Sequence, residues 1–198
     1  MFTINNVTLR YLEFKDIDTL YSWETDIELA LWSGWTIPRI YAAFRHKYEQ
    51  RLTEPEKDLE MLGIEFEGQL VGSVQLYDID EYERRAEVGI QVGEKSLWGR
   101  GIASTALRII LDYAFTVRNL ERVCAEVYAF NQRSLRLMER VGFQKEGILR
   151  QHEIHNGVRQ DMHFYGMLKA EFYQNYETIF KLPGDMNDEI RTGKDVEA

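Results

Sequence analysis

The sequence feature that most constrains this fold is a pair of glycines placed directly before an amphipathic helical pattern. Gly99 and Gly101 flank Arg100, and apolar side chains then recur at spacings of three and four, at Ile102, Ala106, Ile109, Ile110, Tyr113 and Ala114. This spacing predicts a helix with one buried face. Glycines at such a turn leave consecutive N–H groups free at the positive end of the helix dipole, which suits a phosphate group.

Patterns typical of strands and further helices surround this central element. Strands are predicted at 7–12, at 59–79 with a turn at 67–69, at 86–92, at 122–128 and on both sides of Asn156-Gly157. Helices are predicted after Asp16 as a cap, from Pro38 to Leu52, from Asn131 to Gly142, and at 171–179. This order predicts a single α+β domain in which helices cover a mostly antiparallel sheet.

Length and charge limit the function classes. The 198 residues fit one domain, which we expect at 1–180, and 181–198 is interpreted as an acidic mobile tail because the apolar pattern ends there. The net charge of −9 argues against non-specific binding to nucleic acid. No apolar run approaches the ~20 residues of a membrane helix. The single cysteine, Cys124, fits a reducing compartment, and we expect a cytoplasmic protein without a signal peptide.

A second motif follows the predicted strand at 122–128. Asn131 begins a helical pattern, Ser134 falls in its first turn, and Gly142-Phe143 ends it. Read alone, this is a capped helix with a glycine stop. Together with the glycine loop, it resembles the acetyl-CoA-binding core of the GNAT family of N-acetyltransferases, whose motifs are Arg/Gln-x-x-Gly-x-Gly/Ala and Asn-x-x-Ser/Ala followed by Gly-Phe.

The resemblance implies a fold and a cofactor. The chain departs from the first motif at Trp98, where Arg or Gln is usual; this departure is common in the branch that acetylates the N-termini of ribosomal proteins. The implied fold is a splayed, mostly antiparallel sheet flanked by helices, and the implied cofactor is acetyl-CoA, without a metal. The residues that the resemblance assigns to the cofactor are Val92, Trp98, Gly99, Arg100, Gly101, Ile102, Ala103, Ser104, Asn131 and Ser134.

The resemblance also implies direct attack of an amine on the thioester, which needs a base and an acid. Glu87 lies where relatives often place the base; the alternative is a solvated residue paired with Arg84 or Arg85. Met138 stands where many relatives have an acidic Tyr, and a thioether cannot donate a proton. Ser134 then becomes the candidate acid, and its alternative role is a hydrogen bond to the pantetheine arm.

Acceptor binding is assigned to aromatic residues. Trp32 and Trp35 lie in the segment that walls the acceptor pocket in relatives, and Tyr165 is a further candidate. Their alternative role is packing under the loop. The neighbouring acidic residues Glu24, Asp26 and Glu28 favour a basic acceptor or simply form a solvated helix end.

Three functions remain open at this point. A protein N-terminal amine of ribosomal type is the favoured acceptor, given Trp98, Ser134 and the long final hairpin. A polyamine or another small cationic amine, such as an aminoglycoside, is the alternative, because 84–87 and 113–117 resemble bacterial spermidine acetyltransferases. A non-catalytic acyl-CoA-binding module is the third. No nucleic-acid or membrane partner is expected, and a homodimer would be in keeping with the family.

Overall fold

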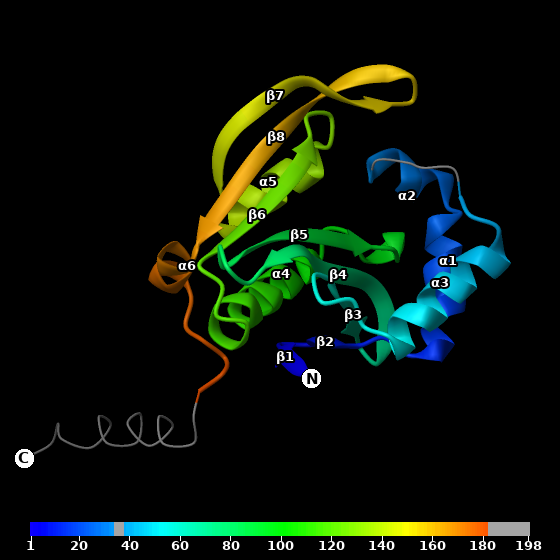
Figure 1. Cartoon of the computed structure of the whole chain (residues 1–198), viewed down its shortest axis with the longest axis horizontal. Coiled ribbons are helices and arrows are strands. Elements are labelled where there is room, and N and C mark those ends of the chain that lie inside the picture. The colour runs from blue at the N-terminus through cyan, green and yellow to red at the C-terminus, as the bar shows by residue number, and fades with distance from the viewer. Residues whose placement is uncertain (34–37, 182–198) are drawn as a thin grey trace, which may run out of the picture.

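An eight-stranded sheet forms the centre of the molecule (Figure 1). The structure is a computed structural model that describes residues 1–33 and 38–181. The strand order is β1-β2-β3-β4-β5-β6-β8-β7. The strands are β1 (Phe2–Ile4), β2 (Val7–Tyr11), β3 (Glu60–Phe66), β4 (Gln69–Asp80), β5 (Arg85–Val92), β6 (Arg122–Tyr128), β7 (Gln144–His155) and β8 (Val158–Leu168). Neighbouring strands run antiparallel except β5 and β6, which confirms the predicted α+β fold class.

Helices lie on both sides of this sheet. They are η1 (Phe14–Asp16), α1 (Ile17–Glu24), α2 (Ile27–Trp32), α3 (Tyr41–Thr53), η2 (Lys95–Leu97), α4 (Ile102–Asp112), the π-helix η3 (Tyr113–Val117), α5 (Gln132–Val141) and α6 (Lys169–Asn175). The first three α-helices pack together at one end of the molecule (Figure 1). Helix α4 packs against β1, β2, β4, β5 and α5, and its predicted apolar face is buried. The N-termini of α4 and α5 are thereby fixed beside the ends of β5 and β6.

The sheet splits between β5 and β6. Their parallel pairing covers Arg85↔Arg122, Ala86↔Val123 and Glu87↔Cys124, and stops there. Strand β5 nevertheless continues to Val92 and β6 to Tyr128. The two strands therefore diverge, as the resemblance to a splayed sheet implied.

Short elements without a periodic pattern were not predicted. Strand β1 pairs with β2 through a turn at Asn5, and α2 lies in a stretch for which the sequence analysis predicted no helix. The Asn156-Gly157 turn was predicted correctly, and both residues have positive φ, at 49° and 72°. Residues 182–198, which hold nearly all of the predicted tail, lie outside the described part of the chain. Within the described residues, no helix is long and apolar enough to cross a membrane.

A buried ion pair fixes the N-terminal helices to the sheet. Arg10 on β2 donates to both carboxylate oxygens of Asp16, at 2.8 and 3.0 Å, and to Glu65 on β3 at 2.8 Å. Asp16 makes no cap bond to α1, contrary to prediction, because Arg10 and the Glu13 N–H occupy its carboxylate. Burial alone would raise the pKa of Asp16, but the hydrogen bonds and charge of Arg10 outweigh it and hold the pKa below the ordinary 3.8.

We predict that Asp16→Asn destabilises the fold by roughly 3 kcal/mol near neutral pH, because it leaves Arg10 buried without a charged partner. Because the folded-state pKa is lowered, the contribution of Asp16 is fully present above 3.8 and is lost as the pH falls through the folded value. The gap between wild type and variant should therefore narrow in acid. Urea unfolding measures both effects. Asp58→Asn, at an exposed carboxylate, is the control and should change stability by less than about 0.5 kcal/mol; an equal loss in both variants would contradict the assignment.

Candidate functional site

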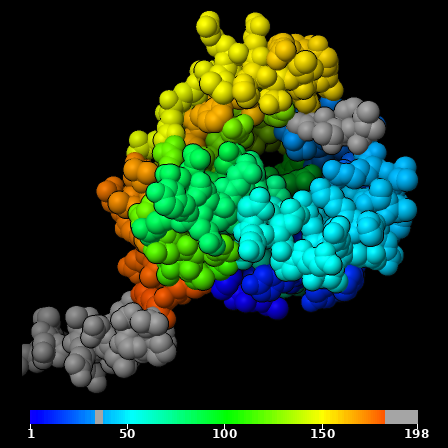
Figure 2. Space-filling model, in the orientation of Figure 1, coloured from blue at the N-terminus to red at the C-terminus, as the bar shows by residue number. Residues whose placement is uncertain are grey.

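A cavity of about 860 Å³ occupies the split between β5 and β6. On one side of the sheet it is lined by the start of α4 and by α5, including Ile102 and Leu137. On the other side it is lined by residues of the N-terminal helices, including Trp23 and Leu29. Figure 2 shows the molecule hollowed between the β7–β8 hairpin and these helices. The cavity therefore runs through the sheet, so that ligands can enter from two sides and meet at the split.

The loop before α4 has the backbone of an anion cradle. Gly99 and Gly101 both have φ of 82°, which is the left-handed region that side chains rarely adopt. The amides of Ile102, Ala103 and Ser104 start α4, where they have no carbonyl partner within the helix, and all three residues line the cavity. This loop fits the diphosphate of CoA, as the sequence motif implied. Arg100 points elsewhere: its guanidinium stacks on Phe66 at 5.1 Å and it does not line the cavity.

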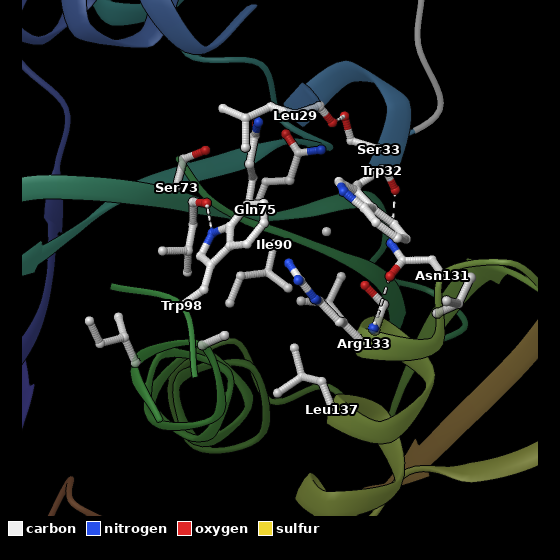
Figure 3. Close-up of a pocket in the computed structure, with 18 of the residues that line it drawn as sticks. Leu29, Trp32, Ser33, Ser73, Gln75, Ile90, Trp98, Asn131, Arg133 and Leu137 are labelled. Atoms are coloured by element: carbon white, nitrogen blue, oxygen red, sulfur yellow. Dashed lines mark hydrogen bonds between the residues drawn. The ribbon is translucent and has the colours of Figure 1, made fainter. Parts of the chain in front are cut away.

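Trp98 connects the phosphate loop to the end of β5. Its Nε1–H donates to the Val92 carbonyl at 2.8 Å, and both residues line the cavity (Figure 3). The next residue, Gly93, is packed so closely that an added Cβ would lie 2.1 Å from the Trp23 ring. Two indoles therefore hold the end of β5: Trp98 through its hydrogen bond to Val92, and Trp23 through its packing on Gly93.

Asn131 connects α5 to the acceptor wall, by which we mean α2. Its Oδ1 accepts the Ser134 N–H at 3.1 Å, as predicted for a cap, and its Nδ2 donates to the Trp32 carbonyl at 2.8 Å (Figure 3). Asn131, Ser134 and Trp32 all line the cavity. Trp35 lies outside the described residues.

Two carboxylates lie where the split begins. Glu87 belongs to the last pair of β5 and β6, opposite Cys124, and does not line the cavity. Glu126, two residues beyond Cys124 and on the same face, does line it. Burial first, and then the charge of Glu87, raise the pKa of Glu126 above the ordinary 4.5. The sequence analysis missed Glu126: a carboxylate in a largely apolar strand is unusual, but the sequence does not show which face of the sheet it lies on.

Tyr165 is not at the cavity. It is 1% exposed, pairs with Ala125 on the helix-covered face, and its hydroxyl lies 3.4 Å from Glu139 on α5. Strand alternation turns it away from the face that carries Glu126. Tyr77 and Tyr128 line the cavity instead, and burial followed by the charge of Glu87 raises the pKa of Tyr77.

We predict that Gly101→Asp weakens CoA binding by roughly tenfold or more, because it adds backbone strain and a negative charge beside the phosphates. Calorimetric titration with CoA measures the effect. Gly68→Asp is the matched control, since Gly68 also has positive φ, at 78°, but lies in the β3–β4 turn with open space around it. Unchanged CoA affinity in the Gly101 variant would show that the diphosphate binds elsewhere.

Comparison with known proteins agrees with this geometry. Residues 6–144 match the family model described as an acetyltransferase (GNAT) domain. The chain is 31% identical over 175 residues to the uncharacterized N-acetyltransferase p20 of Bacillus licheniformis, covering 84% of this chain and 94% of that protein. It is 34% identical over 110 residues to the putative ribosomal N-acetyltransferase YdaF of Bacillus subtilis (strain 168), covering 56% of this chain and 60% of that protein.

A solved structure shares the fold. The spermidine N-acetyltransferase from Vibrio cholerae, in a crystal structure with CoA and spermine, superposes with a TM-score of 0.78 at 25% identity, over 85% of this chain and 98% of that one. The splayed sheet, the cradle before α4 and the family match lead to one conclusion: this chain belongs to the GNAT family and is an acetyl-CoA-dependent N-acetyltransferase.

Proposed function

We propose that the acceptor is a single primary amine at the N-terminus of a protein chain, as in the acetylation of ribosomal proteins. The observation that carries this proposal is that only two carboxylates among the described residues line the cavity, Glu24 and Glu126, and that Glu126, with Glu87 close enough to raise its pKa, is the one without a basic partner. Within the described residues, neither Glu87 nor Glu126 takes part in an ion pair with Lys or Arg. One such pair of carboxylates suits one ammonium group.

The acidic residues near α2 are already paired. Lys95 donates to Asp26 at 2.8 Å and to Glu28 at 3.0 Å, and Arg39 lies 3.6 Å from Glu24. The predicted role of these residues in attracting a basic acceptor is therefore weakened, because internal cations neutralise them. A polyamine needs carboxylates for several ammonium groups along its length, and of the two that line the cavity among the described residues, Glu24 is already paired with Arg39.

Glu126 takes the role that the sequence analysis gave to Glu87. When bound, acetyl-CoA would supply the thioester carbonyl for attack by the free amine: a C–N bond would form, the C–S bond would break, and the amine would lose its second proton while the departing thiolate gained one, so that CoA would leave as the thiol. Before the attack, the ammonium N–H bond breaks and the proton passes to a Glu126 carboxylate oxygen, which later releases it to water. A carboxylate with a raised pKa is better matched to this task near neutral pH. The role left to Glu87 is to raise the pKa of Glu126.

Ser134 remains the candidate donor to the departing sulfur. Its backbone N–H is bound by Asn131, its side chain lines the cavity, and it lies in the first turn of α5. The positive end of the helix dipole stabilises negative charge there. Ser134 therefore supports the leaving thiolate, a role that Met138 cannot take.

A polyamine is the second candidate acceptor, favoured by the likeness to the spermidine acetyltransferase and by Glu24, which also lines the cavity. A panel of acceptors with mass detection separates the two. We expect acetylation of peptides with a free α-amine and none of the same peptides with a blocked N-terminus and an internal Lys. Turnover of spermidine at a kcat/KM above that of every peptide would contradict the proposal.

We predict that Glu126→Gln lowers kcat/KM by roughly 100-fold, because the base is lost. In the wild type, kcat/KM should fall as the pH drops through the raised pKa of Glu126. Glu87→Gln removes the charge that, after burial, raises the pKa of Glu126 most, so the pKa of Glu126 falls and this acidic limb moves to lower pH, while activity above it persists. The other charged groups that bear on Glu126 are His152, Glu153 and Asp78.

Glu83→Gln, in the exposed β4–β5 turn, is the control and should leave the pH profile unchanged. The reverse result, with Glu87→Gln inactive and Glu126→Gln active, would identify Glu87 as the base.

A further inference from the structure

Arg133 lies between two tryptophan rings on the wall of the cavity. Its guanidinium carbon is 4.6 Å from the ring centre of Trp98 and 5.4 Å from that of Trp32 (Figure 3). Both distances are within the ~6 Å range of cation–π attraction. We call these three side chains the Trp–Arg bridge.

Each ring of the bridge is anchored separately. Trp98 is held to the end of β5 through the Val92 carbonyl, and Trp32 is held to α5 because its carbonyl accepts from Asn131. Arg133 is therefore the middle of a chain of contacts that runs from the phosphate loop to the last residue of α2. In this way side chains span the gap that the backbones of β5 and β6 leave open.

The bridge crosses between the two sides of the cavity. In Figure 3, Arg133 lies between Trp98 and Trp32, with α4 and Leu137 on one side and Leu29 and Gln75 on the other. The phosphate loop belongs to the first side and the acceptor wall to the second. The Arg133 side chain is itself exposed.

We propose that Arg133 is a positioning residue that couples the two substrates: CoA seated against the phosphate loop tightens the Trp–Arg bridge and so orders the C-terminal end of α2. The role of α2 as the acceptor wall rests on the proposed function. A ligand that covers Trp98 and the exposed guanidinium removes water from them, and cation–π attraction is stronger when desolvated. By linkage, an ordered α2 binds CoA more tightly in return.

The two ends of α2 offer an internal comparison. Lys95 holds the first turn through Asp26 and Glu28, whereas the Trp–Arg bridge holds the last residue, Trp32. The Ser33 amide, which donates to Leu29 at 3.1 Å, reports on order at that last turn. Coupling through Arg133 should therefore protect the end of α2 more than its start.

Hydrogen exchange with and without CoA tests the proposal. In the wild type, CoA should slow exchange in peptides that cover 29–33. Arg133→Ala should abolish most of this protection and weaken CoA binding about fivefold, as expected for loss of a cation–π contact. Arg133→Lys keeps the charge but loses the planar group, so it should also lose the protection. Arg136→Ala is the matched control: it removes a positive charge from the same helix and cavity wall, but Arg136 has no cation–π contact with a tryptophan among the described residues, and with CoA at a concentration that saturates each variant the protection should persist.

Two results would overturn the coupling role. One is CoA binding in the wild type without protection at 29–33; the other is full protection in Arg133→Ala or Arg133→Lys. Denaturant midpoints equal to that of the wild type exclude misfolding of these exposed-site variants. Because only CoA is added, failure of the acceptor panel would overturn the proposed acceptor and leave this measurement unaffected.

Discussion

The early end of hydrogen bonding between β5 and β6 is the constraint on which the site depends. Beyond Glu87 and Cys124, each strand continues without the other, so its inward N–H and C=O groups need a different partner. Water or an amide-bearing ligand can supply it, much as an added strand completes a sheet. The pantetheine arm of CoA carries such amides. The split in the sheet is thus a polar slot of the right chemistry for the cofactor of this family.

The same split directs two helices at the cavity. Helix α4 begins after the glycine loop that follows β5, and α5 begins after its cap residue Asn131, shortly after β6. Their positive ends therefore converge where the strands diverge. Trp98 and Arg133, one from each connection, then meet across the gap. The early end of the β5–β6 pairing therefore has three effects. It opens the slot, it directs the positive ends of two helices at the slot, and it lets Trp98 and Arg133 meet across it.

Sequence predicted those parts of the site that depend on local geometry. The turn before α4 requires positive φ at Gly99 and Gly101, and the start of α5 requires a capping residue, which is Asn131. These local requirements could be recognised in the sequence without knowledge of the fold. Glu126 and Tyr165 could not be assigned in this way, since both lie on strands where alternate residues face opposite sides. Which side is open depends on where α4 and α5 pack, and that is a long-range property. Helix α2 was not predicted because its six residues are too few to show the apolar periodicity of a helix.

The chain has a net charge of −9 and nevertheless binds an anionic cofactor. The net charge does not prevent this binding, because exposed charges more than about 8–10 Å from a ligand are largely screened at physiological salt. Three arginines of α5, Arg133, Arg136 and Arg140, line the cavity along with the N-termini of α4 and α5, whereas Glu24 is paired with Arg39, and Asp26 and Glu28 are paired with Lys95. Glu87 and Glu126, which form no ion pair with Lys or Arg among the described residues, lie where the split begins, and this is where we propose that the acceptor gives up its proton. The cavity therefore has a positive part at α5 and the helix N-termini and a negative part at Glu87 and Glu126, although the net charge of the chain is negative.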